Sequence, residues 1–315
     1  MRSSLLFAIA GFSSLSLALV APPRPLQQGR DEDPFTIAVD ADLVVFNVTV
    51  TDNKGRLVAG LKAGDFQVRE DNRLESIRSF SAEDGPASIG LIIDNSGSMR
   101  DKHADVARAA LGFVSASNPE DETFVVTFNE KVFLGLPPSI PFTSDLNQIH
   151  SALIRNPPNG MTALYDAIAA GTEHLKYGSR DHKALVVLSD GGDNASRRRL
   201  EDVQQIVRQS STTIFTIGIY DDTDLDRNPR VLRRIAESSG GKAFFPASLR
   251  DMDRVWGDIA VRIRSQYTIG YHSSNPSHDG RFRTVKITAS RGNTGNLSVS
   301  TRPGYPGPSN PVEAK

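Results

Sequence analysis

Apolar and polar residues alternate in the first part of this chain that carries a regular pattern. The run LVVFNVTVT begins at Leu43, and shorter alternating runs follow in DFQVRE and SIRSF. A period of two is typical of strands with one buried face. The pattern predicts a small β segment over residues 37–82. Because so few strands bury little apolar area, we expect this segment to be marginal on its own.

From residue 88 the pattern changes to near-continuous apolar runs separated by stretches of helical periodicity. SIGLIID, KALVVLSD and TIFTIGIY read as strands that are buried on both faces. Apolar residues recur at helical spacing over residues 102–115, 145–155 and 251–265. Strands that alternate with helices predict an α/β fold over residues 86–266. Its sheet should be doubly wound and mostly parallel, with helices on both faces.

The C-terminal part returns to short alternating runs, in QYTIGYHSS, RFRTVKITAS and NLSVSTR. They predict a second β segment over residues 267–302, followed by a Pro- and Gly-containing tail over residues 303–315. The β segments before and after the α/β core are candidates to pair into one small flanking module.

The N-terminal residues have the composition of an export signal. Arg2 precedes an apolar run from Leu5 to Val20 that contains small residues near its end. We therefore expect a signal peptide over residues 1–21, a Pro-rich linker over residues 22–36, and a periplasmic or extracellular protein. An uncleaved anchor is the alternative, although a run of about 16 residues is short for a membrane span. After cleavage we expect no stable membrane span.

Composition excludes several classes of function. The 315 residues include 36 basic and 37 acidic ones, so the formal net charge is −1, and no global positive field attracts nucleic acid. The absence of cysteine excludes thiol nucleophiles, Cys-ligated zinc and disulfides. The zinc-protease motif H-E-x-x-H, the G-x-S-x-G nucleophile elbow and the P-loop are also missing. We therefore expect a protein that is not an enzyme.

Oxygen-bearing side chains stand where the predicted strands end or a helix begins. These residues are Asp94, Ser96 and Ser98 in DNSGSM, Thr162 in NGMTALYDA, and Asp190 in LSDGGDN. Ligands of open α/β sheets bind beyond the carboxyl ends of the strands. Hydroxyl and carboxylate oxygens suit Mg²⁺, Ca²⁺ or Mn²⁺. Because only two carboxylates would surround the ion, it would stay electrophilic and favour a carboxylate from outside.

These motifs resemble the metal-ion-dependent adhesion site of the von Willebrand factor type A domain, in that family's chain order and over residues 86–266. The resemblance implies that Ser96 and Ser98 bind the ion directly, and that Thr162 and the two aspartates bind it directly or through water. It also implies Mg²⁺ as the first choice of ion, with Ca²⁺ or Mn²⁺ as alternatives. The flanks are similar to type A-related secreted proteins first noted in acidobacteria. By the same resemblance, the helix over residues 251–265 is a candidate to shift when a ligand binds.

An arginine run is expected at the same edge of the sheet, in GGDNASRRRL. Arg197, Arg198 and Arg199 would oppose the dipole of the helix that follows them. An acidic partner is one explanation for them, and an ordinary solvated face is the other. We expect Asp166 and Asp193 to hold loops through hydrogen bonds.

The acidic loop YDDTDLDRNP is a second candidate for partner contact, through Asp222 and Asp224. It mimics the start of an EF-hand calcium loop, but Arg227 stands where glycine is required. A solvated acidic loop is the better interpretation.

Together these patterns predict a secreted, adhesion-like module that uses its metal ion to capture an Asp or Glu side chain of a partner protein. Two alternatives stay open. The domain could be an envelope scaffold whose metal serves only folding. A metal-assisted hydrolase is the other, although no general base is evident.

Overall fold

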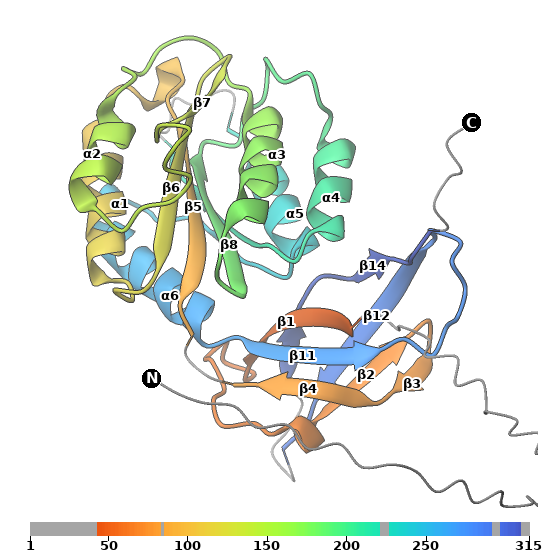
Figure 1. Cartoon of the computed structure of the whole chain (residues 1–315). Helices are drawn as coiled ribbons and strands as arrows, with labels where there is room; N and C mark the ends of the chain where they lie inside the picture. The colour runs from red at the N-terminus through yellow and green to blue at the C-terminus, as the bar shows by residue number, and fades with distance from the viewer. Residues whose placement is uncertain (1–42, 83–84, 221–226, 292–296, 310–315) are drawn as a thin grey trace, which may run out of the picture. The chain divides into compact units, whose positions relative to one another are not determined.

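The computed structural model describes residues 43–82, 85–220, 227–291 and 297–309, which form a six-stranded sheet and two four-stranded sheets (Figure 1). The predicted signal peptide and linker, and Asp222 and Asp224, lie outside these residues. No helix in the described ranges combines the length and the apolar character that crossing a membrane requires.

The six-stranded sheet is built from the strands predicted for the α/β core. Its order is β10-β9-β8-β5-β6-β7, and only β7 runs antiparallel to its neighbour. The strands are β5 (Ala87–Asp94), β6 (Glu122–Phe128), β7 (Val132–Leu134), β8 (His182–Ser189), β9 (Thr213–Gly218) and β10 (Ala243–Phe244). Every residue of β5 is buried, because helices cover both faces of the sheet. The predicted doubly wound, mostly parallel sheet is confirmed.

Six helices of the described chain pack in two groups, α1 with α2 and α6, and α4 with α3 and α5. Figure 1 shows α1 and α2 to the left of the strands, and α3, α4 and α5 to the right. The helices are α1 (His103–Ala116), α2 (Leu146–Ile154), α3 (Leu164–His174), α4 (Leu200–Gln209), α5 (Pro229–Ser238) and α6 (Met252–Arg264). Close packing depends on Gly171 of α3, where an added Cβ would lie 2.6 Å from Cδ1 of Ile92. Trp256 of α6 is buried against Phe113, as a core residue is.

One strand is shorter than its sequence pattern suggests. The run KAFFPAS reads as a full strand, but only Ala243 and Phe244 pair with β9. Pro246 has no backbone N–H to continue the ladder, so the strand ends at the sheet edge. Short edge strands of this kind limit unwanted pairing with other chains.

The flanking β segments pair with each other in both four-stranded sheets. One sheet has the order β13-β1-β11-β4, and the other has the order β14-β12-β2-β3. The strands are β1 (Leu43–Thr51), β2 (Phe66–Glu70), β3 (Arg73–Glu75), β4 (Ile77–Ser81), β11 (Tyr267–His272), β12 (Phe282–Ala289), β13 (Ser298–Ser300) and β14 (Gly304–Pro306). We call this module the β sandwich.

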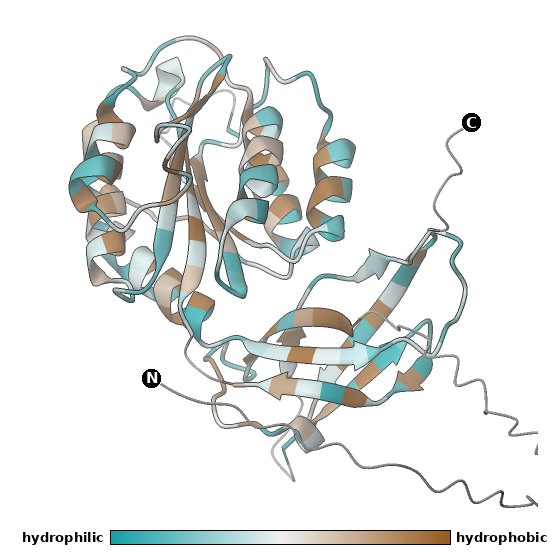
Figure 2. Ribbon diagram, in the orientation of Figure 1, coloured by the Kyte–Doolittle hydropathy of each residue, from teal (hydrophilic) through white to brown (hydrophobic). Residues whose placement is uncertain are grey.

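The β sandwich has its own core. Residues of β12 alternate between exposed and buried, and Figure 2 shows brown bands between paler or teal ones along β11 and β12. The inward residues of both segments contribute to one cluster that includes Phe46, Val68 and Tyr271. The two segments therefore share a core that neither could build alone.

The predicted tail over residues 303–315 needs a correction, because it contains β14. Gly304 to Pro306 pair with β12, and Tyr305 is buried with its hydroxyl donating to Oε2 of Glu70 at 2.7 Å. Prolines at 303, 306 and 308 gave this stretch the composition of a loop. A proline is tolerated here because β14 is an edge strand.

The α/β domain is an insertion in the β sandwich. The chain leaves the sandwich after β4 and returns to it at β11, and these two strands are antiparallel neighbours. Ser81 at the end of β4 pairs with Thr268 near the start of β11. The two connections of the inserted domain therefore start one strand spacing apart.

Candidate functional site

Asp94 is the last residue of β5, and its carboxylate is fully buried. Oδ1 accepts a hydrogen bond from the backbone N–H of Ser96 at 2.9 Å, and Oδ2 accepts one from Oγ of Ser189 at 2.6 Å. Burial raises the pKa of Asp94 to about 6, against the hydrogen bonds from Ser189 and Ser96, and the nearby charge of Asp190 adds to the rise. The protein thus keeps a carboxylate where a negative charge is costly.

Two serines connect this carboxylate region to Asp190. Oγ of Ser96 lies 3.1 Å from Oγ of Ser98, and Oγ of Ser98 donates to Oδ2 of Asp190 at 2.7 Å. Asp190 is only 2% exposed, and its Oδ1 accepts the backbone N–H of Gly192 at 2.9 Å. Four of the five predicted metal-site residues therefore lie in one hydrogen-bonded group at the carboxyl ends of β5 and β8.

Thr162 lies in the loop between α2 and α3, and neighbouring loops hold it there. Its backbone N–H donates to Oδ1 of Asn194 at 2.8 Å, and its carbonyl accepts the N–H groups of Asn194 and Ala195 at 3.0 Å each. On the other side, the carbonyl of Gly160 accepts the N–H of Gly97 at 3.1 Å. The Thr162 loop is therefore bonded to both of the other loops that carry predicted ligands.

The turn before Thr162 requires a glycine. Gly160 has a φ of +84°, in the left-handed region, and a Cβ at this position would meet the carboxylate of Glu130. The same carboxylate accepts the N–H of Met161 at 3.3 Å. The loop conformation is thus fixed by backbone geometry as well as by its hydrogen bonds.

The donor set fits a hard divalent cation. It holds two carboxylates and three hydroxyls, and four of these five residues, all but Ser98, are nearly or fully buried. In the described part of the chain, no group of three or more His, Cys, Asp or Glu side chains gathers as a metal cluster. The hydroxyl and carboxylate oxygens of the five residues favour Mg²⁺, Ca²⁺ or Mn²⁺ over softer ions.

Sequence reasoning missed two residues that hold the site together. Ser189 precedes Asp190 directly, and its hydroxyl reaches Asp94 across neighbouring parallel strands. Asn95 is buried, and its Nδ2 donates to the carbonyl of Asn156 at 2.7 Å. The polar residue within the strand run LVVLS was the signal for Ser189, because an isolated polar side chain in a buried strand needs a partner.

The arginine run has mixed surroundings. Nη1 of Arg198 donates to Oδ1 of Asp166 at 2.9 Å, and the backbone N–H of Arg197 donates to Oδ2 of the same carboxylate at 2.9 Å. The side chains of Arg197 and Arg199 are exposed.

The second loop-holding acid of the sequence analysis is Asp193. Oδ2 of Asp193 accepts the N–H of Tyr165 at 3.0 Å. The prediction that Asp166 and Asp193 hold loops is confirmed.

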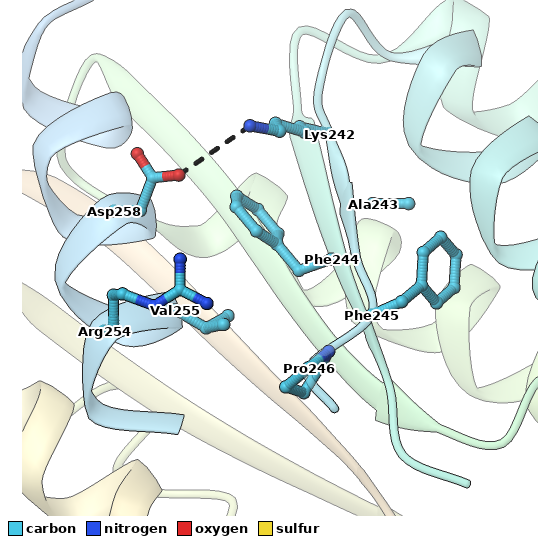
Figure 3. A pocket seen from close by; sticks show the side chains of 8 residues that line it. All are labelled: Lys242, Ala243, Phe244, Phe245, Pro246, Arg254, Val255 and Asp258. Carbon is cyan, nitrogen blue, oxygen red and sulfur yellow. Dashed lines mark ion pairs between the residues drawn. The ribbon is translucent and has the colours of Figure 1, made fainter. Parts of the chain in front are cut away.

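A cavity of about 330 Å³ lies between β10 and α6, away from the five predicted metal-site residues (Figure 3). Phe244 points toward α6, Phe245 points away from it, and Nζ of Lys242 lies 3.7 Å from Oδ2 of Asp258. The lining residues are Lys242, Ala243, Phe244, Phe245, Pro246, Arg254, Val255 and Asp258. Helix α6 is therefore not closely packed along this side. Its shift on ligand binding stays a prediction.

Comparisons with solved structures find the same α/β fold in other proteins. The chain is similar to a von Willebrand factor type A protein from Catenulispora acidiphila, with 15% identity, 78% of this chain and 73% of that chain covered, and a TM-score of 0.51. It is also similar to the conserved hypothetical protein BatB from Bacteroides thetaiotaomicron, with 17% identity, 57% and 100% covered, and a TM-score of 0.47. A third similar structure is proximal thread matrix protein 1 from the mussel byssus. The identity is 17%, the match covers 62% of this chain and 51% of that chain, and the TM-score is 0.48. The match to the Catenulispora acidiphila protein shows a shared fold and no more than the fold.

No curated protein sequence matches this chain. The family model described as von Willebrand factor type A domain matches residues 88–255, which is more than half of the 315 residues. The matched range begins in β5 and ends in α6, so it includes the central sheet and all the predicted metal-site residues. The chain therefore belongs to the von Willebrand factor type A domain family.

Proposed function

We propose that this protein binds a divalent cation, Mg²⁺ by preference, at Asp94, Ser96, Ser98, Thr162 and Asp190, and that it uses the ion to bind a carboxylate of a partner protein. The observation that carries the proposal is the hydrogen-bonded group at the ends of β5 and β8. It places the buried Asp94 and Asp190 beside the hydroxyls of Ser96 and Ser98.

Charge supports a cation at this place. Asp94 receives its hydrogen bonds from neutral donors, the hydroxyls of Ser189 and Ser96 and a backbone N–H, and Asp190 acts on it as a like charge. A divalent cation would offset both charges. The hydroxyls of Ser96 and Ser98 would complete its ligand set without adding negative charge. When bound, such an ion supplies a coordination position at which an outside carboxylate is attracted.

The three loops also support a binding role over a purely structural metal. Direct backbone hydrogen bonds join the first loop to the Thr162 loop, from Asn159 to Asn95 and from Gly97 to Gly160. Others join Thr162 to the loop after β8. Hydrogen bonds of the protein itself therefore hold the three loops together.

Type A domains are in general interaction modules. We extend that property to this chain and propose that it binds a partner without catalysis. The sequence shows no general base that would activate Ser96 or Ser98 as a nucleophile. The proposed setting is outside the cytoplasm, on the strength of the export-type N-terminal sequence.

The exposed Arg197 and Arg199 are proposed to contact the partner around the captured carboxylate. Met161 is 53% exposed and directly precedes Thr162, so it offers an apolar contact on the same loop. A partner segment with an acidic residue, further acidic neighbours and an apolar side chain would suit this surface.

A pull-down from envelope extracts, with Mg²⁺ and then with excess chelator, tests the proposal. The wild-type chain is expected to retain a partner only with the metal, and Asp94→Ala is expected to lose both the metal and the partner while it stays folded. Binding that persists in chelator would contradict the mechanism. A scaffold role would instead make Asp94→Ala lower the thermal stability as much as it lowers binding.

A further inference from the structure

We infer that Asp166, Asp193 and Ser196 are positioning residues that set the affinity of the metal site by capping helix α3 from the loop that carries Asp190. The inference rests on the proposed function. In this inference, a specific set of hydrogen bonds fixes the position of Thr162 relative to Asp190.

Helix α3 has no side-chain cap of its own. It begins at Leu164, and Ala163 stands at the N-cap position, where its methyl side chain cannot accept a hydrogen bond. The first N–H groups of any helix lack partners within the helix. A Ser, Thr, Asp or Asn at the N-cap position normally supplies one of them. The N-terminus of α3 therefore depends on acceptors from elsewhere in the chain.

The loop after β8 supplies those acceptors. Oδ2 of Asp193 accepts the N–H of Tyr165 at 3.0 Å, and Oγ of Ser196 accepts the N–H of Asp166 at 3.1 Å. Oγ of Ser196 also donates to Oδ2 of Asp193 at 2.6 Å, which orients both caps. The second and third N–H groups of α3 are thus satisfied by residues about 30 positions further along the chain.

The arrangement is reciprocal. The carboxylate of Asp166 accepts the backbone N–H of Arg197 and a guanidinium N–H of Arg198, each at 2.9 Å. Burial acts to raise the pKa of Asp166, but these hydrogen bonds and the Arg198 charge hold it below its ordinary value. In a capping box, an N-cap Ser and an N3 acid exchange such bonds within one segment. Here Ser196 accepts the N–H of Asp166, and Asp166 accepts the N–H of Arg197, so the exchange joins helix α3 to the loop after β8.

Thr162 is attached to this structure at both sides. It lies two residues before α3, and Asn194 of the capping loop bonds its N–H and its carbonyl. Asp190 lies three residues before Asp193 in the same loop. The start of α3 and the Asp190 loop therefore form one rigid unit, in which Thr162 has a fixed place relative to Asp190. Loss of the reciprocal cap would let Thr162 move away from the position that ligation needs.

The test measures Mn²⁺ affinity, by calorimetry and by electron paramagnetic resonance of free Mn²⁺, on the full chain well below its melting temperature. Ser196→Ala is expected to weaken Mn²⁺ binding by about tenfold or more, as loss of residues that orient metal ligands generally does. Ser196→Thr keeps the hydroxyl and is expected to restore most of the affinity.

Asp145→Ala is the matched control. Asp145 caps α2 of the same domain by accepting the N–H of Asn147 at 2.8 Å, but it belongs to none of the three ligand-bearing loops. It should lower the melting temperature of the metal-free protein about as much as Ser196→Ala does, with an unchanged Kd for Mn²⁺. A purely structural cap at Ser196 would give the same result as Asp145→Ala, and that result would overturn the inference.

Asp94→Ala distinguishes a failure of the proposed metal site from a failure of the positioning role of Ser196. If it abolishes Mn²⁺ binding while Ser196→Ala leaves the Kd unchanged, the inference is wrong and the proposed metal site stands. If Asp94→Ala leaves Mn²⁺ binding intact, the proposed metal site is wrong, and the inference is overturned with it.

Discussion

Two buried carboxylates of this protein are treated in opposite ways. In the β sandwich, Glu70 accepts hydrogen bonds from the hydroxyls of Tyr271, Ser273 and Tyr305 at 2.6–2.8 Å, and Nη1 of Arg283 lies 3.3 Å away. In the α/β domain, Asp94 is held by the hydroxyls of Ser189 and Ser96 and by the backbone N–H of Ser96, and its charged neighbour is another acid. The protein thus supplies Glu70 with a counter-charge of its own, whereas the charge that acts on Asp94 is that of a second acid. Under the proposed function, a cation from outside would offset both acids.

Burial of a carboxylate therefore has different consequences in the two regions, depending on the charges around it. A buried acid with an internal cation and a full set of donors makes a closed network, which fixes the fold of the sandwich. A buried acid whose strongest charged neighbour is another acid makes an incomplete network. Incomplete networks are costly unless something from outside completes them, so a buried acid of this kind is a candidate for a functional site.

The largest expected effect is on stability, from breaking the closed network. Glu70→Ala leaves Arg283 buried without its counter-charge, so we expect a loss of about 3–5 kcal/mol in the free energy of unfolding. Urea denaturation followed by circular dichroism measures it. The double variant Glu70→Gln with Arg283→Met should recover part of the loss. The Kd for Mn²⁺ should not change, and a weaker Kd would show that the two networks are coupled.

Asp94→Asn tests the open network through pH. The pKa of Asp94, about 6 in the folded metal-free protein, lies above its ordinary value of 3.8. The folded state therefore binds this proton more tightly than the unfolded state. The stability that this proton provides is present below pH 4 and is lost as the pH rises through 6. The loss amounts to about 3 kcal/mol.

Urea denaturation of the chelated proteins between pH 4 and pH 7 measures this effect. The stability of the wild type should fall relative to that of Asp94→Asn, which carries no titrating group at this position. Any hydrogen bond altered by the amide shifts the two curves by a constant amount and leaves the relative slope unchanged. Parallel curves would contradict a raised pKa at Asp94. The variant should also lose Mn²⁺ binding.

Gly160→Ala should affect both stability and the metal site. The positive φ and the Glu130 carboxylate both oppose a Cβ at this position, so we expect a loss of about 1–2 kcal/mol and weaker Mn²⁺ binding. Gly55→Ala is the control, since Gly55 has a φ of +75° in a turn of the β sandwich and has open space around it. It should cost about 1 kcal/mol and leave the Kd for Mn²⁺ unchanged. Equal Mn²⁺ affinities in the two variants would count against a preset loop.

Arg198→Ala should have the smallest effect. The Arg198 side chain is 49% exposed in its ion pair with Asp166, and exposed pairs contribute at most about 1 kcal/mol. Arg56→Ala removes a comparable exposed pair with Asp52 in the β sandwich. Thermal unfolding at low and high salt should give small, similar and salt-sensitive shifts. If Arg198→Ala lowered the free energy of unfolding by several kcal/mol, the Arg198–Asp166 pair would behave as a buried ion pair and not as an exposed one.

The sequence alone allowed the fold class and the positions of the five candidate ligands to be predicted. Parallel strands end at one edge of a sheet, so Asp94 and Asp190 had to lie near each other once their strands were recognised. That argument needs only the alternation of strands and helices. Whether these residues bind a metal stays a prediction.

The contacts that hold the site were beyond sequence reasoning. The bonds from Ser196 to Asp166 and from Ser189 to Asp94 join residues 30 and 95 positions apart, and no local pattern marks such pairs. Similarly, β14 could not be recognised, because its strand character comes from pairing with β12 and from the fit of Tyr305 beside Glu70. Local composition around β14 suggested only a loop.

The insertion of the α/β domain between β4 and β11 has a mechanical consequence. A pull applied to the α/β domain reaches the β sandwich through two adjacent strands, β4 and β11, at once, so each carries only part of the load. Tension between the segments that precede Leu43 and follow Pro306 instead enters at β1 and β14 and bypasses the inserted domain. In a pulling experiment with handles on those segments, the β sandwich should therefore unfold before any force reaches the predicted metal-site residues of the α/β domain.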